Sequence, residues 1–140
     1  MLGRTMRSVT LSTYRDDPLY PRIVRATDDI LQRGKVVAPV DLLVGMKLLT
    51  TARLDDWRGG RIDYLERVIE GNLSRLSRLL RILRLHAHDL NLKPSVTAYQ
   101  GSSKQPLRFK KTGDQKLEEA YATHFIWPGK GPPPTRRESE

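Results

Sequence analysis

The sequence predicts a mostly α-helical α+β protein with a small β-hairpin, and three observations support this. One apolar stripe at helical spacing covers residues 61–90, helix start and stop signals precede it, and two short β-like runs follow it. With 140 residues, 38% of them hydrophobic, the chain suits a single domain with a modest core. We expect a partly ordered N-terminal arm at 1–17, one helical domain carrying the hairpin at 18–127, and a disordered tail at 128–140.

The long amphipathic segment, residues 61–90, is the most informative feature of the chain. At 100° per residue, ten of its apolar side chains fall within an arc of roughly 140°, and five arginines lie outside that arc, namely Arg67, Arg75, Arg78, Arg81 and Arg84. Gly71 and Asn72 interrupt the segment, and Asn72 could cap a fresh helix there. Because the stripe keeps its phase across the pair, we favour one continuous helix with a kink at Gly71.

Three shorter helices are expected before this segment. The first opens at Pro18 and stops at Gly34, which suits the end of a helix. The second, residues 39–49, opens at a proline and is apolar nearly all round, so we expect it to be the most buried helix. The third, residues 52–58, follows two threonines, either of which can cap it.

After the long segment, the chain has the composition of β-structure. Residues 96–100 and 106–111 are two strand-like runs joined by a Gly-Ser loop, so a β-hairpin over about 96–111 is the simplest arrangement. Asp114 can then cap a short C-terminal helix, residues 114–124. The Phe-Ile-Trp run that follows is expected to pack back onto the core.

The charge balance favours an anionic partner. The chain has 25 Lys+Arg against 16 Asp+Glu, a net charge of +9, and arginine supplies seventeen of the bases. Arginine makes bidentate contacts with phosphates and carboxylates, so nucleic acid is the first partner to consider. Cysteine is absent, which excludes a disulfide framework. The sequence shows neither a signal peptide nor a membrane span, so we expect a cytoplasmic protein without a membrane partner.

No motif in the sequence indicates catalysis. His86 and His88 are two residues apart, which places their rings about 200° apart on a helix and prevents a shared metal. Adjacent carboxylates such as Asp55 and Asp56 point about 100° apart, so they cannot serve as acid and base on one face. We therefore expect no catalytic residue, no cofactor and no metal site.

The order of the predicted elements is that of a helix-turn-helix core with a basic wing. We therefore hypothesise a small non-enzymatic nucleic-acid-binding regulator, with DNA favoured over RNA. The expected contacts with nucleic acid come from basic residues on the long helix and on the hairpin, namely Arg75, Arg78, Arg81, Arg84, Lys104, Arg108, Lys110 and Lys111.

The alternative hypothesis is a protein-interaction or dimerisation module that uses the long helix. Ile82 and Leu85 lie off the main stripe, toward the basic side, where a second chain could cover them in a homodimer. One observation separates the two hypotheses. Nucleic-acid binding requires the helix arginines and the hairpin bases on one contiguous surface, whereas scattered bases beside exposed aliphatic residues favour an interaction module.

Overall fold

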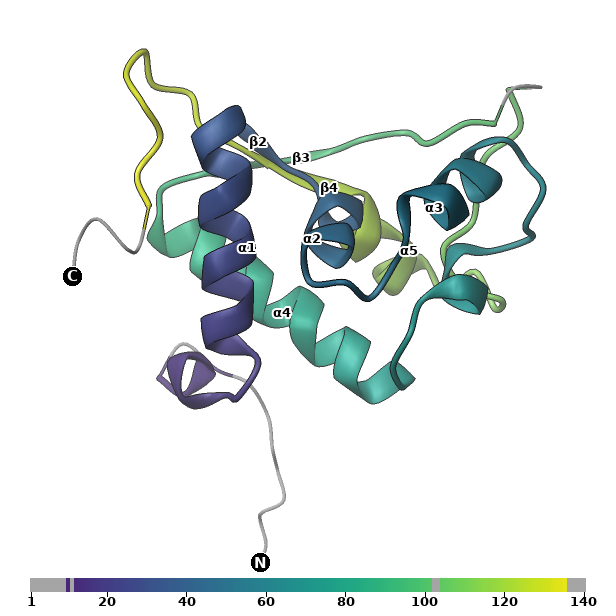
Figure 1. Ribbon diagram of the computed structural model, residues 1–140, viewed down its shortest axis with the longest axis horizontal. Coiled ribbons are helices and arrows are strands. Elements are labelled where there is room, and N and C mark those ends of the chain that lie inside the picture. The colour runs from purple at the N-terminus through teal and green to yellow at the C-terminus, as the bar shows by residue number, and fades with distance from the viewer. Residues whose placement is uncertain (1–9, 11, 102–103, 136–140) are drawn as a thin grey trace, which may run out of the picture.

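The computed structural model describes residues 10, 12–101 and 104–135. Within them, five α-helices and one three-stranded antiparallel sheet form a mostly helical α+β fold, as predicted (Figure 1). The helices are α1 (Tyr20–Arg33), α2 (Pro39–Gly45), α3 (Thr51–Arg58), α4 (Leu73–Asp89) and α5 (Gln115–Ala122). The 3-10 helices are η1 (Tyr14–Asp16) and η2 (Leu65–Val68), and the strands are β2 (Val36–Val37), β3 (Lys93–Val96) and β4 (Thr123–Ile126).

The short helices form where local signals predicted them. The hydroxyl of Thr50 accepts a hydrogen bond from the backbone N–H of Arg53 at 3.1 Å, which caps α3. The carboxylate of Asp114 accepts from the N–H groups of two residues in the first turn of α5. Proline opens α2, although this helix ends at Gly45, earlier than predicted.

The prediction of one continuous helix over 61–90 is wrong, because the helical conformation is interrupted just before α4. Gly71 has a φ of 115°, which a helix does not contain, and the side chain of Asn72 accepts from the N–H of Arg75 at 2.8 Å. Asn72 is thus the N-cap of α4, the alternative that the sequence had left open. The backbone N–H of Glu70 donates to the carbonyl of Leu48 at 2.8 Å, which fixes the break against the turn between α2 and α3.

The apolar phase continues across this break for a reason unrelated to helix formation. Leu65 lies in η2 and Ile69 follows it, yet both are buried in the same core as the Leu-rich face of α4. The spacing of apolar residues therefore predicted burial correctly over residues 61–90. It predicted a continuous helix correctly only over α4.

The predicted β-hairpin over 96–111 is present only close to its loop, where the N–H of Leu107 donates to the carbonyl of Tyr99 at 2.9 Å, whereas β3 pairs with β4. Pro94 lies opposite Phe125 and Val96 opposite Thr123, and β4 is the central strand of the order β2-β4-β3. In the described part of residues 97–111, the chain forms only isolated bridges, one of them between Gln100 and Pro106. The wing of the predicted helix-turn-helix arrangement is therefore reduced to one short antiparallel bridge.

The core lies where α4 crosses α1 and packs against α5 (Figure 1). Leu76, Leu79 and Leu83 of α4 are buried, as the stripe predicted. Ile82 has no exposed surface within a single chain, so a second chain cannot cover it as the homodimer hypothesis required. Leu85 is half-buried against the same core.

The two ends of the chain are described only in part. Of the predicted N-terminal arm, residues 1–9 and 11 lie outside the described residues, whereas Tyr14 is buried in η1 and donates to the Asp89 carboxylate at 2.8 Å. Toward the C-terminus, Lys35 donates to the carbonyl of Gly129 at 2.9 Å, and Thr135 is buried. The last five residues of the predicted tail lie outside the described residues.

Candidate functional site

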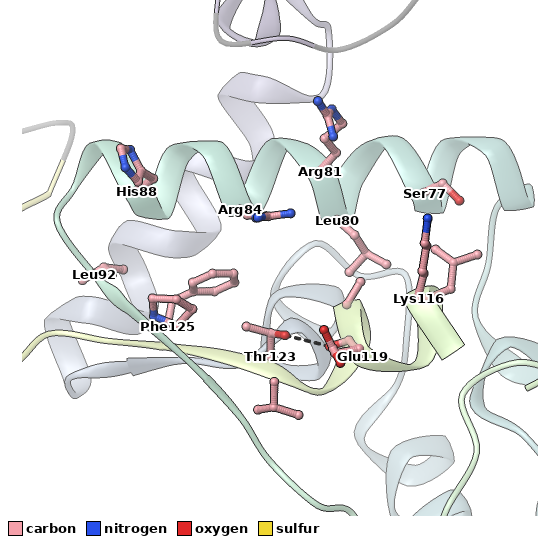
Figure 2. Close-up of a pocket in the computed structure, with 14 residues that line it drawn as sticks. Ser77, Leu80, Arg81, Arg84, His88, Leu92, Lys116, Glu119, Thr123 and Phe125 are labelled. Atoms are coloured by element: carbon pink, nitrogen blue, oxygen red, sulfur yellow. Dashed lines mark hydrogen bonds between the residues drawn. The ribbon is translucent and has the colours of Figure 1, made fainter. Parts of the chain in front are cut away.

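A groove of about 630 Å³ lies between α4, one face of the sheet and α5 (Figure 2). Fourteen residues line it, and half of them are apolar. The helix α4 forms one wall, β3 and β4 form the floor, and α5 lies at one end. This surface has both the size and the apolar character of a binding site.

The floor of the groove follows from the register of β3 on β4. Alternate residues of a strand point to the same face, so the opposed pairs Pro94–Phe125 and Val96–Thr123 face α4 together. Val96 is 61% exposed, the larger of the two values found for exposed large hydrophobic residues in the described chain. The bottom of the groove thus presents an aliphatic side chain to solvent.

The wall of the groove is a row of polar and basic side chains on α4. Ser77, Arg81, Arg84 and His88 are spaced four, three and four residues apart. At 100° per residue they fall within an arc of roughly 60°, next to the buried leucine face. From α5, the amine of Lys116 points toward α4 near Ser77 (Figure 2).

The lining of the groove is positively charged. Its fixed charges are Arg81, Arg84 and Lys116 against the single carboxylate of Glu119. Figure 2 shows Arg84 between α4 and the sheet, whereas Arg81 extends from the outer side of the helix. Arg84 and Lys116 are therefore the cations closest to the apolar floor, and Arg81 lies at the rim.

The structure divides the four predicted arginines of α4 between two sides of the helix. Arg81 and Arg84 line the groove. Arg78 faces away from it, and its Nε lies 2.7 Å from Oδ2 of Asp17 in a largely buried ion pair. By the same helical geometry, Arg75 lies on the side of Arg78. Steps of about 60° separate these arginines around α4, so two of the four predicted arginines line the groove.

The predicted bases of the hairpin lie elsewhere. Lys104, Arg108, Lys110 and Lys111 belong to a segment beside α3 and η2, and none of them lines the groove. The backbone of this segment is anchored: the carbonyl of Arg108 accepts the indole N–H of Trp57 at 2.7 Å, and the N–H of Lys110 donates to Glu118 at 2.7 Å.

A second cavity of about 660 Å³ lies between the α2–α3 turn and η2 and is lined by Arg53, Arg61 and Arg67. Their charges are balanced locally. Asp56 lies 3.1 Å from Nε of Arg61, Asp63 lies 3.9 Å from Nη1 of Arg67, and Glu70 is itself part of the lining. The lining of this cavity therefore has the same charge balance as the groove, three cations and one carboxylate, but two of its arginines also pair with carboxylates just outside it.

The histidines occupy three different environments. His86 is buried and packs edge-on against the ring of Tyr20, whereas His88 is exposed on the groove wall. His124 lies on the opposite face of the sheet and is hydrogen-bonded through Nε2 to the hydroxyl of Tyr99 at 2.7 Å. Burial lowers the pKa of His124 and raises the pKa of Tyr99 to about 12. Among the described residues, no cluster of His, Asp or Glu is placed to hold a metal ion.

No protein-family model matches the chain, and no curated protein or solved structure is significantly similar to it. In the part of the chain that the structure describes, no helix is long and apolar enough to cross a membrane. Sequence reasoning had found Arg81 and Arg84 but missed Lys116 and the floor of the groove. The spacing from Ser77 to His88 was a readable signal for the wall, but the floor is formed by a strand pairing with no local signature.

Proposed function

We propose that the protein is a protein-interaction module that binds a segment of a partner protein in the groove beside α4. The observation that carries this proposal is the combination of an exposed aliphatic floor with a basic wall. Covering Val96 and its neighbours removes apolar surface from water, which drives association. The cations at the edge then select partners and speed their approach.

The composition of the groove favours a protein segment over nucleic acid. Single-stranded nucleic acids bind by stacking bases on aromatic side chains, and the aromatic residue in the lining, Phe125, is only 5% exposed. Binding along a duplex requires a continuous row of basic side chains that contact phosphates. Here Arg78 is paired with Asp17, and the basic side chains of residues 104–111 lie outside the groove.

A second copy of the chain is a poor occupant of the groove. Each copy carries a net charge of +9, so bringing a second basic surface to the basic wall costs repulsion. The homodimer contact proposed from the sequence also loses Ile82 to the core. The partner that fits best is therefore another protein.

Selection from a displayed library of random peptides tests this proposal. Val96→Asp places a carboxylate on the groove floor, and Val36→Asp is a matched control because Val36 is the other exposed large hydrophobic residue and lies on β2, outside the groove. We expect peptides selected on the wild-type protein to bind the Val36→Asp variant with equal affinity and to lose binding to the Val96→Asp variant. Selected peptides that ignore Val96→Asp would place the binding surface elsewhere.

Nucleic-acid binding is the second candidate, favoured by the net charge of +9 and seventeen arginines. A titration with short DNA and RNA duplexes at several salt concentrations tests it. If phosphates contact the groove, changing Arg81, Arg84 and Lys116 together to Gln should reduce the slope of log affinity against log salt by about 0.9 per lost contact on B-DNA. Tight duplex binding that is insensitive to Val96→Asp would replace the interaction module as the proposed function.

A further inference from the structure

We infer that the occupant of the groove is an acidic amphipathic α-helix that lies along α4. This inference rests on the proposed function and adds the chemistry and conformation of the bound segment. Three features support it: the charge of the lining, the spacing of the lining residues on α4, and the composition of the strand at the groove edge.

The charge of the lining calls for carboxylates on the partner. Arg84 and Lys116, the cations closest to the floor, outnumber Glu119, so an occupant without negative charge would exclude water from them without replacing it by a carboxylate. The side of the occupant that faces the floor must be apolar, because the exposed side chains of Pro94 and Val96 lie there. Two neighbouring faces of different character are the property of an amphipathic segment.

The spacing of the wall fits a helical partner. Ser77 and His88 are eleven residues apart on α4, which corresponds to about 16 Å along its axis. A partner helix of about three turns has the same length, and carboxylates three or four residues apart on it form a row that can face Arg84 of α4 and Lys116 of α5. Helix binding in an apolar groove is an established form of peptide recognition.

An extended partner strand fits less well. It would have to add to the free edge of β3, which is only four residues long and contains Pro94, a residue without a backbone N–H. Short edges that contain proline are the usual means by which proteins prevent strand addition. The sheet therefore contributes side chains to the groove but offers a poor edge for pairing.

Two synthetic peptides of identical composition test the inference. One carries glutamates spaced four and three residues apart with leucines on the adjacent helical face, and the other contains the same residues in scrambled order. Binding to the whole protein is measured by fluorescence anisotropy, and helix formation on binding is measured by circular dichroism. We expect the patterned peptide to bind and gain helicity, and the scrambled peptide to bind at least tenfold more weakly.

Charge reversal identifies the cations involved. Arg84→Glu combined with Lys116→Glu should reduce the affinity for the patterned peptide by roughly a hundredfold, at about tenfold per reversed charge. A peptide with lysines in place of the glutamates should bind this double variant better than it binds the wild-type protein. Arg25→Glu is the control, because Arg25 is exposed on α1 and lies outside the groove lining.

The outcomes separate this inference from the proposed function. Equal binding of both peptides, or binding without a gain in helicity, would overturn the helical occupant. Failure of both peptides to bind, while library peptides still depend on Val96, would overturn the acidic helix and leave the interaction module standing. If the library also yields no peptide whose binding depends on the groove, both the acidic helix and the interaction module are overturned. Duplex binding that responds to Arg84→Glu but not to Val96→Asp would overturn both as well.

Discussion

Arg78 and Asp17 form an ion pair that joins α4 to the turn preceding α1. Nε of Arg78 lies 2.7 Å from Oδ2 of Asp17, and the two side chains are 33% and 11% exposed. The other carboxylate oxygen of Asp17 accepts the backbone N–H of Leu19 at 2.9 Å. One carboxylate thus fixes the beginning of α1 and its position against α4.

Removing the charge from either member of this pair should destabilise the fold. Because the pair is largely buried, we expect Arg78→Gln or Asp17→Asn to cost about 1–2 kcal/mol, between the values for exposed and buried pairs. Asp17→Ala should cost more, since it also removes the acceptor for Leu19. Urea denaturation measures these free energies, with Arg84→Gln in the exposed groove wall as a control that should change stability little. An unchanged midpoint for Arg78→Gln would show that the pair contributes nothing to stability.

The break before α4 makes a prediction with a definite sign. Gly71 has a φ of 115°, and nothing lies within 4 Å of the position where a Cβ would be added. Gly71→Ala should therefore destabilise the protein by about 1–2 kcal/mol through backbone strain alone. In a continuous helix the same change would stabilise it by about 1 kcal/mol. A denaturation midpoint that rises on Gly71→Ala would contradict the break and support the prediction of an uninterrupted helix.

Loss of the cap at the same break should also be measurable. The side chain of Asn72 accepts from the N–H of Arg75, so Asn72→Ala should cost about 1 kcal/mol. Asn72→Asp keeps the acceptor and adds a negative charge at the N-terminal end of the helix dipole, so it should be neutral or stabilising. Equal loss in the two variants would mean that the side-chain cap is not the source of the effect.

The helices could be predicted from the sequence because their signals are local. The caps at Thr50 and Asp114 and the proline at the start of α2 each act within one turn of the residue that carries them. The break at Gly71 was misjudged because the core buries Leu65 and Ile69 in the same phase as α4. Apolar spacing reports burial, and only a capping signal distinguishes a continuous helix from an interrupted one.

The sheet and the groove could not be predicted in the same way, because they depend on contacts distant in sequence. The residues of β4 follow α5 directly, without a turn signal, and they pair with both β2 and β3. Val96 reaches the groove only through that pairing, and Lys116 only because α5 lies at the end of α4. The basic wall could therefore be predicted from the sequence of α4, whereas the apolar floor could not.

A buried hydroxyl joins η2 to α5 and provides a further test of the core. The Oη of Tyr121 donates to Oε2 of Glu66 at 2.6 Å, and burial together with this carboxylate raises the pKa of Tyr121. Tyr121→Phe should cost about 1–3 kcal/mol, because the carboxylate of Glu66 loses its partner in a half-buried site. Glu66→Gln keeps a carbonyl acceptor and should cost less. A larger loss for Glu66→Gln than for Tyr121→Phe would assign the main role of Glu66 to its charge.

The pairing of His124 with Tyr99 predicts how stability depends on pH. Burial lowers the pKa of His124, with Asp41 opposing the shift and Arg58 adding to it. The unfolded chain, with a histidine pKa near 6.5, therefore takes up a proton at a higher pH than the folded protein does. The stabilising contribution is present above that value and is lost as pH falls toward the folded pKa, because the unfolded state then binds more protons.

Denaturation curves between about pH 8 and pH 5 would show this dependence. His124→Gln should flatten the acid side of the curve relative to the wild-type protein, since the variant has no proton to take up at this site. Tyr99→Phe removes the hydroxyl but leaves the ring to bury His124, so it should retain most of the pH dependence. If His124→Gln and the wild-type protein lose stability in parallel as pH falls, His124 is solvated in the folded state and its packing against Tyr99 does not govern its protonation.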